Sequence, residues 1–126
     1  MNRLGREKPA GGFELFAWFF MRISGIALIV LALGHLAIMH LINNVDIINY
    51  DFVARRWATP FWRTYDMVLL CLALIHGLNG LRTVIDDYVH TMKWRIVSLS
   101  CLYVFGFVVL VIGALVIFTF PFQPVG

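Results

Sequence analysis

The sequence contains three long apolar stretches with very few charges, and these constrain its fold more than any other feature. No Lys, Arg, Asp or Glu occurs between Ile23 and Val45, and none occurs after Ile96. The second stretch begins near Phe61 and is charge-free from Met67 to Leu81. A helix needs about 20 residues to cross a hydrocarbon core of roughly 30 Å. The second stretch reaches this length only if its helix continues past the basic residue that follows Leu81.

Strands would have to close into a barrel to cross the membrane, so helices are the reasonable interpretation. The sequence therefore predicts an all-α integral membrane protein, a bundle of three transmembrane helices within a single membrane-anchor domain, 1–126. The expected helices lie at about 15–42, 61–88 and 96–120.

The composition agrees with a membrane location. Apolar residues make up 61% of the chain and charged residues 13%, whereas soluble domains have about 45–50% and about 25%. A soluble domain of this size buries only about two-thirds of its chain surface, so the excess must face lipid, a partner subunit or a large cofactor. A soluble monomer and a disordered chain are excluded. Ten Lys and Arg against seven Asp and Glu form no dense basic face, which argues against nucleic-acid binding.

The basic residues predict the orientation of the chain, because cytoplasmic segments carry an excess of Lys and Arg. With three spans, the N-terminus and the second loop share one side of the membrane. We expect that side to be cytoplasmic and the C-terminus to be external. The N-terminus does not look like an Arg- and Ser-rich transit peptide, which favours a prokaryotic plasma membrane. The shared side carries Arg3, Arg6, Lys8, Arg22, Arg82, Lys93 and Arg95, and the opposite side carries Arg55, Arg56 and Arg63.

Ionisable residues inside a span are functional candidates because their burial in lipid is costly. His76 lies near the middle of the second span and shares a helical stripe with Gly80, Thr83 and Asp87. Gly77 and Gly80 leave a gap beside the imidazole that a flat macrocycle could occupy, although small residues also permit helix contact. A neutral imidazole is a good axial ligand for haem iron. Interhelical hydrogen bonding is the alternative role.

His35 lies on a similar stripe of the first span. If Arg22 and Tyr88 lie at one level in the membrane, His35 and His76 have nearly equal depth, and both could bind one haem. His35 could instead donate to a backbone carbonyl or contact a partner helix. For three further ionisable residues at the end of the second span we expect interhelical bonding or extension to the interface. They are Arg82, Asp86 and His90.

Four polar residues are expected to gather at the cytoplasmic rim, where they could serve a quinone. A Tyr88 hydroxyl can donate to a quinone carbonyl, and Asp87 could orient that hydroxyl or relay protons. An ion pair with an aromatic anchor would explain the same residues. The expected rim consists of Arg22, Ser24, Asp87 and Tyr88.

The segment from His76 to Tyr88, HGLNGLRTVIDDY, resembles the second-helix signature of the small membrane-anchor D subunit of succinate dehydrogenase. That signature has a haem-ligand His, a Gly four residues later, and Asp-Tyr at the eleventh and twelfth positions after the His. Three further segments are similar to the anchors of actinobacterial and related enzymes. They are residues 18–25 (WFFMRISG), 33–36 (LGHL) and 58–62 (ATPFW).

The resemblance implies a non-catalytic subunit that anchors a flavoprotein and an iron–sulfur subunit beside a second, C-type membrane anchor. Electrons from succinate would reach a membrane quinone, either ubiquinone or menaquinone. By position, His76 matches an axial ligand of haem b, and Asp87 and Tyr88 match the quinone pocket. Arg22 and Ser24 match an Arg-x-Ser-Gly motif that is better known from the companion C subunit, where the Arg and nearby polar residues serve the quinone pocket and the haem propionates. The alternatives are the anchor of a quinol:fumarate reductase and a structural membrane adaptor that binds no cofactor.

Overall fold

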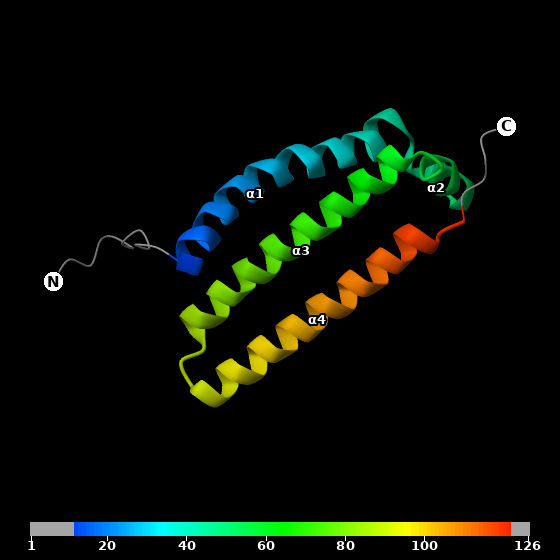
Figure 1. Ribbon diagram of the computed structural model, residues 1–126. Helices are drawn as coiled ribbons and strands as arrows, with labels where there is room; N and C mark the ends of the chain where they lie inside the picture. Colours follow the sequence, from blue (N-terminus) through cyan, green and yellow to red (C-terminus); the bar gives the residue numbers. More distant parts are fainter. Residues whose placement is uncertain (1–11, 122–126) are drawn as a thin grey trace.

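The computed structural model describes residues 12–121 of the chain (Figure 1). Within these residues, three helices are long and apolar enough to cross a membrane, which confirms the predicted all-α, three-span architecture. Arg3, Arg6 and Lys8, on which part of the orientation prediction depends, lie outside the described residues. The elements in chain order are α1 (Gly12–Ala37), the π-helix η1 (Ile38–Ile42), the 3-10 helix η2 (Val45–Ile47), α2 (Tyr50–Arg56), α3 (Pro60–Tyr88) and α4 (Met92–Thr119).

Local sequence accounts for the boundaries of these helices. Pro60 opens α3, at a position where its missing N–H costs nothing and its fixed φ suits a helix. The Asn49 side chain caps α2 by accepting a hydrogen bond of 3.0 Å from the Phe52 N–H. Helix α3, the second of the spanning helices, does continue past Arg82 as far as Tyr88, and it therefore has the length that a span requires.

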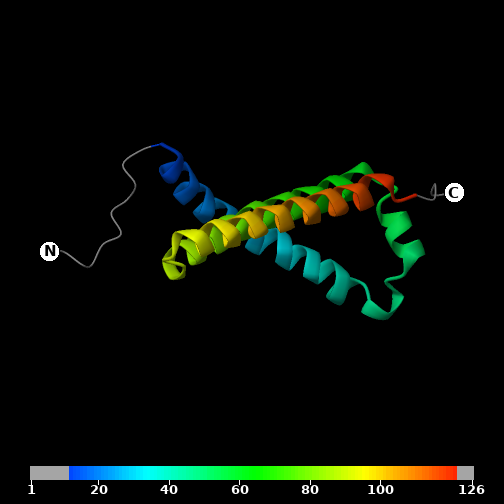
Figure 2. The ribbon, with the colours of Figure 1, turned by 90° about the horizontal axis from the view of Figure 1, so that it is seen from below.

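Helix α3 lies between α1 and α4 (Figure 1). The view in Figure 2 shows that α4 runs alongside α3, whereas α1 crosses α3 obliquely. Glycines let α4 approach closely: a Cβ on Gly106 would lie 2.5 Å from Leu78 Cδ1, and one on Gly113 would lie 2.6 Å from Leu70 Cδ2. Small residues have this role at many helix contacts in membranes.

Few apolar side chains are enclosed by the chain itself. Among the described residues, the buried hydrophobic side chains are Ala17, Ala54 and Ile117. Most large apolar side chains of the three spanning helices are exposed, and the sequence predicted this excess. These surfaces must therefore face lipid or other subunits.

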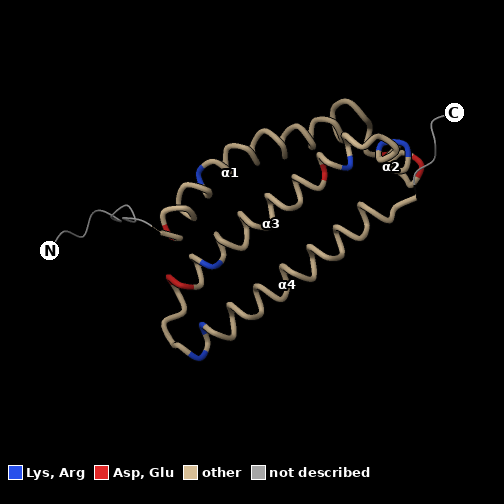
Figure 3. The backbone as a smooth tube through the Cα atoms, viewed as in Figure 1, with Lys and Arg blue, Asp and Glu red and all other residues tan. Residues whose placement is uncertain are grey.

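The charged residues gather at the two ends of the spanning helices (Figure 3). The start of α1 and the connection from α3 to α4, residues 89–91, lie together at one end, which we call the hairpin end (Figure 1). Helix α2, the start of α3 and the end of α4 lie at the opposite end, which we call the loop end. At the loop end, Arg63 donates hydrogen bonds to the backbone oxygens of Trp57 (2.6 Å) and Phe120 (2.9 Å), and this side chain links the first loop to the end of α4.

Candidate functional site

A polar contact joins α1 and α3 deep inside the spans, between Ser24 and His76. Ser24 Oγ lies 2.8 Å from His76 Nδ1, and Ser24 is only 2% exposed. The neighbouring Gly25 lets the two helices approach, since a Cβ there would already contact His76 Cε1 at 3.5 Å. His76 is about 18 Å along α3 from its C-terminal residue, Tyr88, at 1.5 Å per residue. The contact is therefore far from either end of the helix.

The other ring nitrogen of His76 remains accessible. Nε2 has no hydrogen-bond partner within residues 12–121 and is not fully buried by them. A Cβ on the adjacent Gly77 would meet no atom within 4 Å, so the surface of α3 next to His76 is uncovered. An imidazole with Nδ1 held and Nε2 open has the arrangement that a metal-ligating histidine adopts.

His35 lies in a second polar cluster, which we call the Asp66 cluster. Its members, besides His35 and Asp66, are Arg56 and Trp57. Asp66 accepts hydrogen bonds from Arg56 Nη2 (3.0 Å) and Trp57 Nε1 (2.7 Å), and the Arg56 guanidinium stacks on the Trp62 ring at 4.3 Å. His35 Nδ1 lies 3.4 Å from Asp66 Oδ1. This distance is short enough for an ion pair. The buried Nδ1 nevertheless forms no hydrogen bond with Asp66, because its N–H direction does not point at the carboxylate oxygen.

The two histidines do not have equal depth, contrary to the expectation from sequence. His35 lies beside Asp66 and His76 lies beside Ser24. Asp66 and His76 are ten residues apart on α3, which corresponds to about 15 Å along the helix axis. The two imidazoles of one chain therefore cannot be the two axial ligands of one iron.

The expected rim of four polar residues also divides into two groups. The sequence argument assumed that Arg22 and Tyr88 share a level, but the contact of Ser24 with His76 puts Arg22 about 15 Å deeper than Tyr88. The Arg22 guanidinium lies over the Trp18 ring at 4.2 Å. Asp87 and Tyr88 lie exposed at the end of α3, and Tyr88 is 79% exposed.

The charged residues near the end of α3 pair with the neighbouring helices. Arg82 Nη2 donates to Glu14 Oε1 at 2.8 Å, and Arg82 Nε lies 3.6 Å from Asp86 Oδ2. Arg95 Nε of α4 lies 2.7 Å from Asp86 Oδ1, so the two residues form an ion pair. The N–H does not point at the oxygen, and the pair therefore lacks a hydrogen bond. The predicted interhelical role of Arg82 and Asp86 is confirmed.

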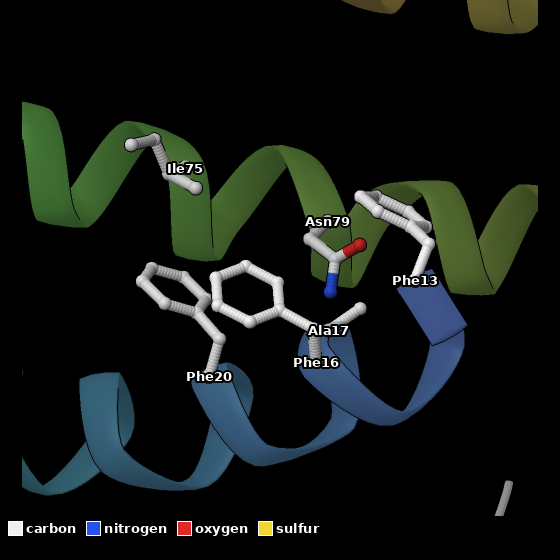
Figure 4. A pocket seen from close by; sticks show the side chains of 6 residues that line it. All are labelled: Phe13, Phe16, Ala17, Phe20, Ile75 and Asn79. Carbon is white, nitrogen blue, oxygen red and sulfur yellow. The ribbon is translucent and has the colours of Figure 1, made fainter. Parts of the chain in front are cut away.

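A groove of about 240 Å³ lies between α1 and α3 near the hairpin end (Figure 4). Among its lining residues, Asn79 has the only polar side chain, and its amide points into the groove in Figure 4. The sequence interpretation did not include Asn79. The signal was present, because an amide in an apolar span is as unusual as a charge. The remaining lining residues are Phe13, Phe16, Ala17, Phe20 and Ile75.

The described residues contain no group of three or more His, Cys, Asp and Glu side chains that could hold a metal ion. A haem iron requires fewer protein ligands, because the macrocycle supplies the equatorial nitrogens and the protein supplies the axial ones. His76, with its open Nε2, fits that requirement as a single axial ligand.

The chain is similar in sequence to known membrane-anchor subunits. The family model described as succinate dehydrogenase/fumarate reductase transmembrane subunit matches residues 4–118. The succinate dehydrogenase hydrophobic membrane anchor subunit of Rickettsia typhi is 27% identical over 90 residues, which cover 68% of this chain and 70% of that protein.

Proposed function

The chain belongs to the family of succinate dehydrogenase/fumarate reductase transmembrane subunits, and we propose that this membrane anchor binds haem b through His76 and a quinone near Asp87 and Tyr88. The observation that carries the proposal is the 2.8 Å contact between Ser24 and His76 Nδ1, which leaves Nε2 open. When bound, haem b supplies a one-electron redox centre in the membrane. The second axial ligand would come from a C-type anchor.

The chain contributes binding and positioning to this activity. His76 would hold the haem iron, and the uncovered helix surface at Gly77 would leave room for the macrocycle. Arg22 offers a cation to a haem propionate or a quinone, since its guanidinium is exposed beside Trp18. Succinate oxidation itself would occur on the flavoprotein subunit, with electrons passing through the iron–sulfur subunit.

We place the quinone beside Tyr88, because its exposed phenol can donate a hydrogen bond to a quinone carbonyl. Asp87 precedes it and is also exposed, so its carboxylate can orient the phenol or relay protons. Both lie at the hairpin end, which the positive-inside rule assigns to the cytoplasm. The flavoprotein and iron–sulfur subunits would dock there, on a bacterial plasma membrane, and residues 1–126 would serve as one anchor domain.

His76→Ala tests the haem assignment. We expect the assembled complex to lose its low-spin, bis-histidine haem spectrum, because one axial ligand is gone. The measurement is the visible and paramagnetic-resonance spectrum of the purified complex. His40→Ala is the matched control, since His40 is an exposed histidine in η1, directly after α1, and it should leave the spectrum unchanged. A normal haem spectrum in the assembled His76→Ala complex would refute the assignment.

Tyr88→Phe tests the quinone site by removing only the hydroxyl. We expect turnover from succinate to quinone to fall about tenfold or more, in line with the loss of one positioned proton donor. Succinate oxidation with an artificial dye should not change, because that reaction bypasses the anchor. Tyr103→Phe, in the middle of α4, is the control. Equal loss of both activities in Tyr88→Phe would argue against the site.

A further inference from the structure

Ser24 is the most enclosed polar side chain of the described residues, with 2% exposure. A hydroxyl buried in an apolar environment costs free energy unless it is hydrogen-bonded. Ser24 Oγ has two polar neighbours, His76 Nδ1 at 2.8 Å and the Met21 backbone oxygen at 3.4 Å. The enclosed hydroxyl therefore makes its strong contact across the helix interface.

The Met21 backbone oxygen favours one direction for that hydrogen bond. A hydroxyl has one proton to donate and lone pairs to accept with. The Met21 backbone oxygen can only accept, so when the Ser24 proton is donated to it, Ser24 Oγ accepts from the Nδ1–H of His76. A neutral imidazole that carries its proton on Nδ1 has a free lone pair on Nε2.

The opposite direction would have the opposite chemical result. If Ser24 donated to Nδ1, the neutral imidazole would carry its proton on Nε2 and could not bind a metal through that atom. Nε2 is the ring nitrogen that has no hydrogen-bond partner among the described residues and is not fully buried by them. The His76 tautomer that donates its Nδ1–H to Ser24 is thus also the tautomer whose Nε2 can bind a metal.

We infer that Ser24 is a positioning residue for His76: it selects the Nδ1–H tautomer, fixes the plane of the imidazole and directs Nε2 outward toward the haem iron. This inference rests on the proposed function, in which His76 is an axial ligand. It moves Ser24 away from the quinone, because Ser24 lies about 18 Å along the spans from Tyr88.

The hydrogen bond also affects the redox balance of the iron. A ligating imidazole that donates its other N–H to an acceptor is a more basic ligand. A more basic ligand favours the ferric state over the ferrous state and lowers the midpoint potential. Removal of the Ser24 oxygen should therefore raise that potential.

The experiment compares Ser24→Ala, Ser24→Cys and Ser24→Thr in the complete purified complex. For Ala and Cys we expect haem affinity to fall about tenfold to a hundredfold. The ferric-to-ferrous ratio at a fixed applied potential should also fall about tenfold. For a one-electron couple this corresponds to a rise of roughly 59 mV in the midpoint potential of the haem. Cys retains most of the volume of Ser, so it reports on the hydrogen bond if Ala fails to assemble. Thr keeps the hydroxyl and should behave like Ser.

Redox titration of the haem absorbance gives the potential, and paramagnetic resonance reports the orientation of the axial ligands. Ser100→Ala is the matched control, since Ser100 is exposed on α4, and it should change neither readout. Wild-type potential and resonance spectrum in both Ala and Cys would overturn the positioning role, while His76 would stand as the ligand. A shift in Thr as large as that in Ala would also overturn it, because packing and not the hydroxyl would then be responsible. Haem retained in His76→Ala would refute the haem proposal itself.

Discussion

His76 and His35 both extend from one spanning helix toward another and both direct Nδ1 at a polar partner, yet their surroundings differ. The partner of His76 is a neutral hydroxyl, Ser24, in a contact remote from either helix end. The partner of His35 is the carboxylate of Asp66, which is 12% exposed and also binds Arg56 and Trp57. One imidazole lies in a neutral environment and the other in a charged cluster.

The difference follows from depth in the membrane. Charges are least costly near the interface, where water and headgroups are close, and most costly in the middle of the bilayer. Asp66 lies only six residues beyond Pro60, about 9 Å along α3, whereas His76 is about 24 Å from that start. A neutral partner thus suits the deep histidine, which is left free to bind a ligand. The charged partners of His35 serve to hold α2 against α1 and α3.

Among the substitutions that test this comparison, Asp66→Asn should have the largest effect on stability. The substitution leaves the Arg56 side chain, 6% exposed, without its counter-charge. Removing one member of a buried ion pair costs about 3 kcal/mol. We expect the thermal midpoint of the detergent-purified complex to fall by several degrees, while the haem spectrum of the complex that remains assembled is unchanged.

The matched control for this prediction is Asp46→Asn, because Asp46 is an exposed carboxylate of the first loop. It should leave the thermal midpoint unchanged. Equal stability of Asp66→Asn and Asp46→Asn would show that the Asp66 cluster does not hold the loop end together. Loss of haem in Asp66→Asn at normal assembly would show that the two histidine environments are coupled.

His35→Ala should have a smaller effect, because His35 forms no hydrogen bond within the Asp66 cluster and its side chain is 37% exposed. We expect a destabilisation of about 1 kcal/mol, typical for the loss of one partly buried contact. The haem content per complex should be unchanged, since His76 lies at a different depth. Quantitative haem determination checks this outcome. A fall in haem content to half would show a second haem at His35 and would remove the contrast between the two histidines.

The sequence predicted which segments cross the membrane, because length and the absence of charge determine whether a helix can span. The sequence also identified His76 and Arg82 as ionisable residues within an apolar span. It did not predict which residues meet across α1 and α3, because the register of two helices depends on packing. Gly25 and Tyr65 lie where α1 and α3 touch, and neither residue gives a signal in hydropathy.

The role of Asp66 could not be predicted for the same reason. Its three partners come from α1, from α2 and from the residue that follows α2. In the sequence, Asp66 is only an isolated charge near the start of a span. Nor did the interpretation of Ser24 as a quinone residue anticipate its contact with His76, because a stripe on one helix does not indicate its neighbour on another.

Alanine substitutions at two glycines of α1 should have the smallest effect on stability. They compare the contact of α1 with His76 directly with its contact with Tyr65. A Cβ on Gly25 would lie 3.5 Å from His76 Cε1, an ordinary contact, whereas one on Gly34 would lie 3.1 Å from Tyr65 Oη. That hydroxyl donates a hydrogen bond of 2.6 Å to the Leu31 backbone oxygen, and its displacement should cost about 0.6–1 kcal/mol.

Both substitutions add the same methyl group to the same helix, so the helix propensity of alanine cancels between them. We therefore expect Gly34→Ala to be about 0.6–1 kcal/mol less stable than Gly25→Ala, measured by thermal unfolding of the purified complex. In a Tyr65→Phe background the difference should vanish, because the hydrogen bond is already absent. If the difference persists there, the Gly34 effect comes from backbone crowding and not from the hydroxyl. If Gly25→Ala proves the less stable variant, α1 is held more tightly at the deep histidine than at the loop end.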